Sequence, residues 1–231
     1  MNLLLNTPAL NVHEHMALDE TLVKLRPDEV TLRFFNWTPG PAVTYGYAQF
    51  YSEVCRALPQ VFSGEFTRRP TGGGVVFHTD DLTFSLVFQY PGRPAEIYEK
   101  LHACISAELA RTNAQKFSLS GVAALSSYRP SHAHEASACF QNPVENDVLT
   151  ADGAKVLGGA LRRFGTTVLY QGSLQLKDAR KNPVYKQAVI NGVRQFLAVD
   201  FTPRGISAQT LQTARALAQT CYSTQSWKEK F

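Results

Sequence analysis

The sequence predicts an α+β fold in which a mixed β-sheet is flanked by helices. Runs rich in β-branched and aromatic residues occur together with longer stretches that carry apolar residues at helical spacing. The two kinds of segment do not alternate one by one, as in proteins built from repeated βαβ units; helices stand between groups of strands. Of the 231 residues, 44% are hydrophobic, which suits one elaborated domain with a substantial core. We therefore expect a single domain over residues 1–231.

The N-terminal part of the chain begins with a predicted helix over residues 13–25, where apolar residues recur at helical spacing. Two strands are expected next, over residues 31–35 and 42–45, because a Pro-Gly-Pro sequence breaks the chain between them. Ser52 is a suitable N-cap for a short helix. A strand over residues 66–69 then leads into a glycine-rich loop.

The rest of the chain is expected to continue with strands and helices in mixed order. In order these are a hairpin of strands 75–77 and 82–88, a helix over 95–111, β-rich segments over 155–163 and 166–176, and helices over 184–197 and 207–221. The polar triplet Thr79-Asp80-Asp81 predicts the turn of the hairpin. Residues 121–137 show no clear period and are expected to form a loop, and long loops in compact domains are often functional.

Composition and charge disfavour several classes of protein. The net charge of +4 suits an acidic partner, but no lysine-rich block points to nucleic acid. The N-terminal segment lacks the basic region and the long apolar run of a signal peptide, and no stretch is long and apolar enough to cross a bilayer. We expect a cytoplasmic protein that binds neither nucleic acid nor a membrane. Its four cysteines form no Cys-x-x-Cys motif and are expected to be thiols.

The segment Arg68-Arg69-Pro70-Thr71-Gly72-Gly73-Gly74 is the most informative stretch of the sequence. Consecutive glycines let the backbone approach a ligand and let amide N–H groups converge on an oxyanion or a phosphate. Two arginines add fork-shaped donors for the same anions, although neighbours in a strand point to opposite faces, so one of them should face the ligand. The loop matches neither the Walker nor the Rossmann glycine pattern. A glycine-rich hairpin with solvated arginines is the alternative.

Lys155 opens a second informative segment, Lys-Val-Leu-Gly-Gly-Ala. A lysine at the start of an apolar strand either reaches solvent or holds an anion. In a site that excludes water, a fixed ammonium stabilises negative charge that develops on an oxygen atom. Composition alone leaves both interpretations open.

Several motifs, in order along the chain, resemble lipoate–protein ligases and lipoyl or octanoyl transferases. These motifs are MALDE, LRFFNWTPGPAVTYGYAQ, RRPTGGGVVFH followed by DDLTFSLVF, GAKVLGGALRRFGTTVLYQGSLQL and YSTQSWKEKF. The resemblance implies the catalytic fold that biotin protein ligases share more distantly, with an acyl tunnel between the glycine loop and the Lys155 strand. It makes Lys155 the catalytic residue that contacts the acyl carbonyl or the phosphate of an acyl-adenylate. The substrate-binding residues that it implies are Arg68, Arg69, Thr71, Gly72, Gly73, Gly74, His78, Gly158, Gly159 and Ala160.

Cys139 stands in a Cys-Phe-Gln-Asn-Pro sequence sixteen positions before Lys155. Cysteine-dependent octanoyl transferases carry a similar Cys-Phe-x-x-Pro sequence at a similar distance before their lysine. The resemblance implies that Cys139 takes octanoyl from acyl carrier protein as a thioester and passes it to a lysine. The alternative is a buried, unreactive thiol. A metal site formed by His132, His134 and Cys139 is disfavoured, because no further ligand pair has the usual spacing.

The resemblance leaves the reaction type open between a transferase and a ligase. The chain ends at Phe231, shortly after the match, so we expect no C-terminal accessory domain, and this favours a transferase that needs no cofactor. A ligase needs ATP and Mg²⁺, and the three-glycine loop is closer to ligases; such an enzyme could be completed by a partner chain. A non-catalytic acyl-binding relative is a third possibility. The expected partners are lipoyl carrier domains of 2-oxoacid dehydrogenases or the glycine cleavage H protein, with acyl carrier protein as donor. The sequence does not separate octanoyl from lipoyl or give the oligomeric state.

Overall fold

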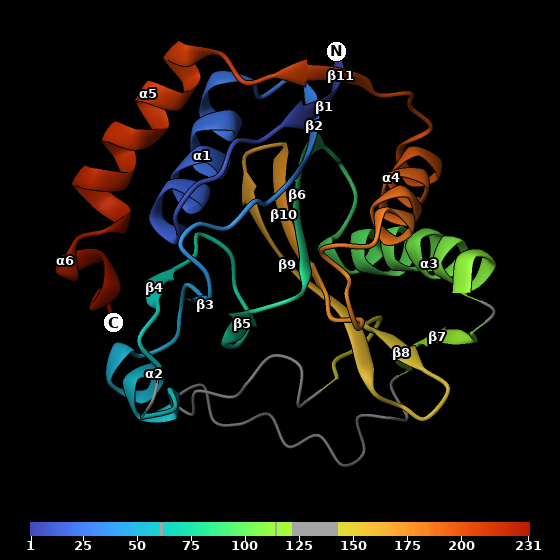
Figure 1. Cartoon of the computed structure of the whole chain (residues 1–231). Coiled ribbons are helices and arrows are strands. Elements are labelled where there is room, and N and C mark those ends of the chain that lie inside the picture. The colour runs from blue at the N-terminus through green and yellow to red at the C-terminus, as the bar shows by residue number, and fades with distance from the viewer. Residues whose placement is uncertain (61, 114, 122–142) are drawn as a thin grey trace.

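The computed structural model describes residues 1–60, 62–113, 115–121 and 143–231 (Figure 1). The strands are β1 (Asn2–Asn6), β2 (Val30–Phe34), β3 (Ala42–Tyr45), β4 (Glu65–Arg68), β5 (Val76–His78), β6 (Leu82–Gln89), β7 (Phe117–Leu119), β8 (Val148–Thr150), β9 (Lys155–Phe164), β10 (Thr167–Leu174) and β11 (Thr202–Gly205). The helices are α1 (Val12–Leu25), α2 (Tyr51–Ala57), α3 (Pro94–Asn113), α4 (Pro183–Leu197), α5 (Ala208–Leu217), the π-helical turn η2 (Ala218–Tyr222) and α6 (Gln225–Lys228).

The strands of the described residues form two sheets. The larger sheet has the order β11-β1-β2-β6-β10-β9-β8-β7, and the smaller one the order β4-β3-β5. In the larger sheet β1 pairs in parallel with β2 and β11. All the other pairs of the sheet, from β2–β6 through β10, β9 and β8 to β7, are antiparallel. The predicted mixed sheet and α+β class are therefore confirmed.

Helices cover both faces of the larger sheet (Figure 1). The α3 and α4 helices pack on one face, and α1 lies on the other face with α5 beside it. Strand β6 shows how the sequence sets this arrangement, because alternate side chains of a strand point to opposite faces. Leu82, Phe84, Leu86 and Phe88 join the core under α3 and α4, whereas Val87 joins the core under α1. The residues between them on the α1 side, Thr83 and Ser85, are buried and polar.

The predicted hairpin of strands 75–77 and 82–88 is wrong. Strand β5 pairs with β3 in the small sheet, whereas β6 pairs with β2 and β10 in the large one. The chain changes sheets at Asp81, whose buried carboxylate accepts hydrogen bonds from Thr83 on β6 and Ser173 on β10. Asp81 is thus an internal anchor and not an exposed turn residue.

Helix α1 begins where the sequence offers a cap. The Asn11 side chain accepts a hydrogen bond from the Glu14 N–H, and the Glu14 carboxylate accepts one from the Asn11 N–H. This start fixes the helix register and turns Met16 and Asp19 toward the sheet, where both are buried. Within the part of the chain that the structure describes, no helix is long and apolar enough to cross a membrane.

Candidate active site

A pocket of about 410 Å³, with the space at its mouth included, lies on the α1 side of the larger sheet. Five of its lining residues belong to the site that the sequence predicts: Arg69, His78, Gly158, Gly159 and Ala160. Met16, Phe35 and Val76 add apolar walls, and Thr44, Thr83, Gln171 and Ser173 add polar side chains. The lining residues come from α1, from both sheets and from Arg69, which precedes the glycine loop, so segments far apart in sequence meet here.

The Lys155 side chain lies beside this pocket and is 2% exposed. Its ammonium lies 2.7 Å from a carboxylate oxygen of Asp147, which is buried as well. Burial raises the pKa of Asp147, and Lys155 and the Val144 N–H offset only part of that increase. Lys155 therefore holds its charge at a fixed place by the pocket and does not reach solvent.

Gly158 and Gly159 each leave room for another side chain. A Cβ atom at Gly158 would lie 2.7 Å from Lys155 Nζ and would overlap Lys155 Cε. A Cβ atom at Gly159 would overlap the hydroxyl group of Tyr170 on β10. The two glycines thus do more than form a low wall for a ligand: they admit Lys155 on one side of β9 and Tyr170 on the other.

The glycine loop packs tightly on the end of β3. A Cβ atom at Gly46 would overlap the carbonyl oxygen of Gly73, whose φ of +85° favours glycine. The Arg69 Nε donates to the carbonyl of Gly72 at 3.0 Å, so this arginine both lines the pocket and holds the loop. Gly73 is exposed, and a Cβ atom at Gly72 would meet no atom within 4 Å. Among the described residues, none covers the outer side of the loop at Gly72 and Gly73.

Arg68 is not among the described residues that line the pocket. Its fully buried guanidinium donates to four backbone carbonyls, those of Tyr47, Gln49, Trp227 and Lys228. These bonds join β4 to the loop after β3 and to the C-terminal helix α6. The two neighbouring arginines therefore point to different places, and the structure gives Arg68 a role in holding these three segments together.

His78 lies in a buried polar cluster at the pocket. Its Nδ1 lies 2.9 Å from Asp81, its Nε2 lies 2.9 Å from the Thr44 hydroxyl, and its ring stacks on Trp37. Burial raises the pKa of Asp81, but His78 and hydrogen bonds from Ser173 and other donors outweigh burial, so the pKa lies below its usual value. A carboxylate facing Nδ1 fixes the histidine tautomer and its orientation.

Thr71 is tied to a second buried network that the sequence did not reveal. Its hydroxyl donates to the Gln171 side chain at 2.6 Å, and the amide of Gln171 donates to Asp19 on α1, also at 2.6 Å. Asp19 in turn pairs with Arg33 at 2.6 Å, and both are fully buried. The sequence does contain one indication of this network. Asp19 stands three positions after Met16, on the apolar face of the helix, and a buried acid there needs a partner.

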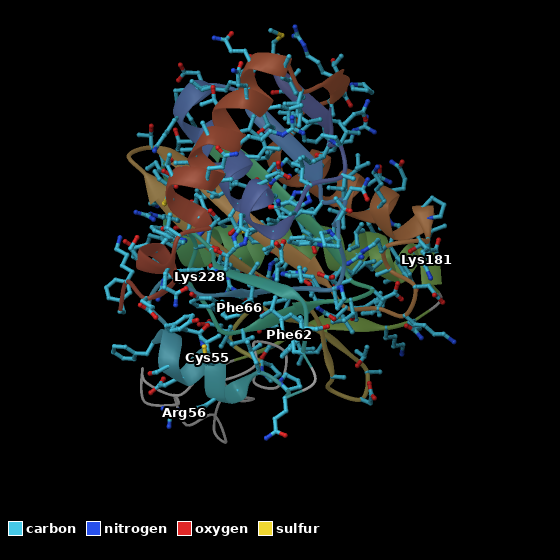
Figure 2. The ribbon with its side chains drawn as sticks, turned by 60° about the vertical axis from the view of Figure 1, so that its left-hand side comes forward. Cys55, Arg56, Phe62, Phe66, Lys181 and Lys228 are labelled. Carbon is cyan, nitrogen blue, oxygen red and sulfur yellow. The ribbon has the colours of Figure 1, made fainter. Side chains whose placement is uncertain are left out.

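The described cysteines lie away from this pocket. Cys55 is exposed on α2 (Figure 2). Cys104 and Cys221 are partly buried, and burial raises the pKa of each thiol. Cys139 lies outside the described residues, as do His132 and His134. Among the described residues, no three His, Cys, Asp or Glu side chains are grouped so that they could hold a metal ion.

Comparison with known proteins agrees with this architecture. Residues 11–188 match the model of the lipoyl protein ligase A/B catalytic domain family. Octanoyltransferase LipM of Symbiobacterium thermophilum is 33% identical over 170 residues, which cover 71% of this chain and 61% of that protein. The match therefore spans less than two thirds of that relative. Octanoyltransferase LipM of Brevibacillus brevis is 26% identical over an alignment of 268 positions that covers 96% of each protein.

Solved structures share the fold at low sequence identity. A lipoate-protein ligase A bound with ATP has a TM-score of 0.75 at 21% identity and covers 99% of both chains. A bi-partite lipoate protein ligase from Thermoplasma acidophilum has a TM-score of 0.72 at 21% identity, over 99% of this chain and 96% of that one. The family match over most of the chain and the 33% identity to a relative lead to one conclusion. The chain belongs to the lipoyl protein ligase A/B catalytic domain family.

Proposed function

We propose that this protein is an acyltransferase that attaches octanoyl groups to a lysine of a lipoyl carrier domain. One observation carries the proposal: the buried ammonium of Lys155 lies against the wall of a pocket with apolar sides, at Gly158. Such a cleft, which combines apolar walls with polar side chains, suits a medium-length acyl chain whose carbonyl is the reacting group. The names of the relatives from S. thermophilum and B. brevis support octanoyl as that chain.

Cys139 is the proposed nucleophile, on the resemblance of its sequence context to that of cysteine-dependent transferases. Its thiolate attacks the carbonyl carbon of an octanoyl thioester, a new C–S bond forms, and the donor leaves as a thiol. The amine of the acceptor lysine then attacks the same carbon, forms an amide, gives up a proton and releases Cys139 as a thiol. In both steps the Lys155 ammonium donates to the carbonyl oxygen while it carries negative charge. This route consumes no cofactor.

The proposed donor is octanoyl–acyl carrier protein, and the proposed acceptor is a lipoyl domain of a 2-oxoacid dehydrogenase or the glycine cleavage H protein. Support for the acceptor class comes from the T. acidophilum ligase, whose structural study includes its E2 lipoyl domain. The net charge of +4 suits acidic carrier domains. The cytoplasmic location inferred from the sequence is part of this proposal.

An ATP-dependent lipoate–protein ligase is the second candidate. It is favoured by the three-glycine loop, whose exposed Gly73 leaves the backbone accessible to a nucleotide phosphate, and by the fold shared with an ATP-bound ligase. This candidate would use ATP and Mg²⁺, and Lys155 would then contact the phosphate of an acyl-adenylate.

Intact-protein mass spectrometry after incubation with octanoyl–acyl carrier protein tests the proposal. Wild type should gain one octanoyl mass that hydroxylamine removes, and Cys139→Ser should gain none. Cys55→Ser is the matched control, because it removes an exposed thiol remote from the pocket and should react like wild type. Addition of a lipoyl domain should discharge the adduct onto the domain.

Two other outcomes select the alternatives. Lipoylation of the domain that depends on ATP and survives Cys139→Ser identifies a ligase. Absence of any turnover, together with octanoate binding that Lys155→Met abolishes, identifies a non-catalytic acyl-binding protein.

A further inference from the structure

A fully buried histidine on α3, His102, lies behind the pocket and has no part in the proposed chemistry. Its Nδ1 lies 2.6 Å from the backbone carbonyl oxygen of Asn146, and its Nε2 lies 2.6 Å from the hydroxyl of Tyr170. A carbonyl oxygen only accepts hydrogen bonds, so Nδ1 carries the proton and Nε2 accepts from Tyr170. Burial lowers the pKa of His102 to about 4, so the ring is neutral at physiological pH. The hydrogen bonds therefore run in one direction, from the Tyr170 hydroxyl to His102 and from His102 to the Asn146 carbonyl.

The residue that receives this hydrogen bond, Asn146, lies in the turn that ends at Asp147, the counterion of Lys155. Asn146 has a φ of +68°, a conformation that a non-glycine residue adopts at some cost, so the turn needs support from its surroundings. Its N–H donates to the Ser120 carbonyl at 2.9 Å, and His102 holds its carbonyl from the other side. The next residue is Asp147, whose carboxylate binds Lys155 at 2.7 Å.

The other end of this series of hydrogen bonds, the Tyr170 hydroxyl, reaches the pocket wall. The Tyr170 hydroxyl occupies the space that Gly159 leaves by having no side chain, and Gly159 lines the pocket. Gly158, its neighbour, leaves the space for the end of the Lys155 side chain. One stretch of β9 therefore fixes both ends of a path that runs from Tyr170 through His102 and the turn to Lys155.

We propose that His102 and Tyr170 are positioning residues of the acyl-transfer site: their hydrogen bonds hold the Asn146–Asp147 turn and, through Asp147, keep the Lys155 ammonium at the pocket wall. The inference rests on the proposed function in giving Lys155 the task of stabilising the acyl oxygen. If the ammonium were misplaced, the affinity of the pocket for the acyl group would change little, but the transition state would be stabilised poorly.

Two substitutions at His102 separate positioning from packing. The amide nitrogen of His102→Asn falls near the position of Nδ1 and still donates to the Asn146 carbonyl, whereas the longer side chain of His102→Gln places its amide near Nε2 and loses that bond. We expect His102→Gln to lower kcat about tenfold to a hundredfold with little change in KM for the octanoyl donor. We expect His102→Asn and Tyr170→Phe to cause a smaller loss, because each loses the bond between residues 102 and 170 but keeps a donor at the Asn146 carbonyl.

Tyr98→Phe is the matched control, because Tyr98 is also on α3 and its hydroxyl accepts a hydrogen bond from the Leu161 N–H of β9 at 3.0 Å. It removes only a hydroxyl that links α3 to β9 and keeps the ring that packs against His102 and Tyr170, so kcat should stay unchanged. Hydrogen exchange of the Asn146 and Asp147 amides gives a readout independent of activity: it should speed up in His102→Gln and stay near wild type in His102→Asn.

Equal losses of kcat in the two His102 variants, a loss that appears in KM, or the same loss in Tyr98→Phe would overturn the inference. If wild-type protein transfers no octanoyl group, the proposed function fails. The hydrogen-exchange comparison then still decides whether His102 holds the turn.

Discussion

Mild acid should destabilise the fold through His102. Burial lowers the pKa of this histidine from 6.5 to about 4, so the unfolded chain binds a proton between these values that the folded protein does not. The free energy of unfolding must therefore fall as pH falls through 6.5 toward 4. With these two pKa values, the loss is about 2 kcal/mol between pH 7 and pH 5, and about 3 kcal/mol by pH 4. At this chain length, 2 kcal/mol lowers Tm by about 4–8 °C.

Other buried groups contribute to the same titration, so the test compares two proteins. Burial also lowers the pKa of His15, which adds a loss of the same sign, whereas the raised pKa of Asp147 acts in the opposite direction. His102→Asn removes the His102 contribution alone. Urea unfolding of both proteins at pH 7 and pH 5 should show that wild type loses about 2 kcal/mol more than the variant. Parallel pH dependences would refute the reasoning, whatever the stability of the variant at pH 7.

Four substitutions test how the site is held. Gly46→Ala should lower the free energy of unfolding by about 1–3 kcal/mol, because its methyl group meets the Gly73 carbonyl, whereas Gly72→Ala should leave stability unchanged; thermal unfolding compares the two variants. Arg68→Lys should cost about 2 kcal/mol or more in urea unfolding, since an ammonium cannot serve four carbonyls, and octanoate affinity should persist. Lys155→Met should abolish transfer and cost up to about 3–5 kcal/mol at neutral pH, because it leaves a buried carboxylate unpaired; calorimetry should show the cost shrinking in acid.

Long elements with a clear period could be predicted from the sequence, whereas four short strands of the larger sheet could not. The pair β9 and β10 follows the predicted segments, and their turn contains Gly165 at a φ of +63°. Strands β1, β7, β8 and β11 were not predicted, because each has three to five residues and owes its existence to pairing with distant strands. Strand β11 even contains Pro203, which is tolerated because the strand lies at the sheet edge.

Five of the predicted site residues line the pocket, whereas the contacts that hold the site together were not predicted. Arg69 lines the pocket as expected for one of two neighbours in a strand, but it also binds the Gly72 carbonyl, a contact that no motif indicates. Asp19, His102 and Tyr170 were not recognised, since a polar residue within an apolar pattern reveals that a partner is needed but not which one. Their partners come from other helices and strands, and the fold had to be known to find them.

The Gly158-Gly159 pair shows why a motif alone misses this level of the structure. If the acyl chain were the only reason for the pair, one glycine would be enough, because neighbouring side chains of a strand point to opposite faces and only one face borders the pocket. The second glycine needs a cause on the far face, and the Tyr170 hydroxyl supplies it. That hydroxyl binds His102, which binds the turn that holds Lys155 through Asp147. The same two residues therefore shape the pocket and leave the space that sets the position of the Lys155 ammonium beside it.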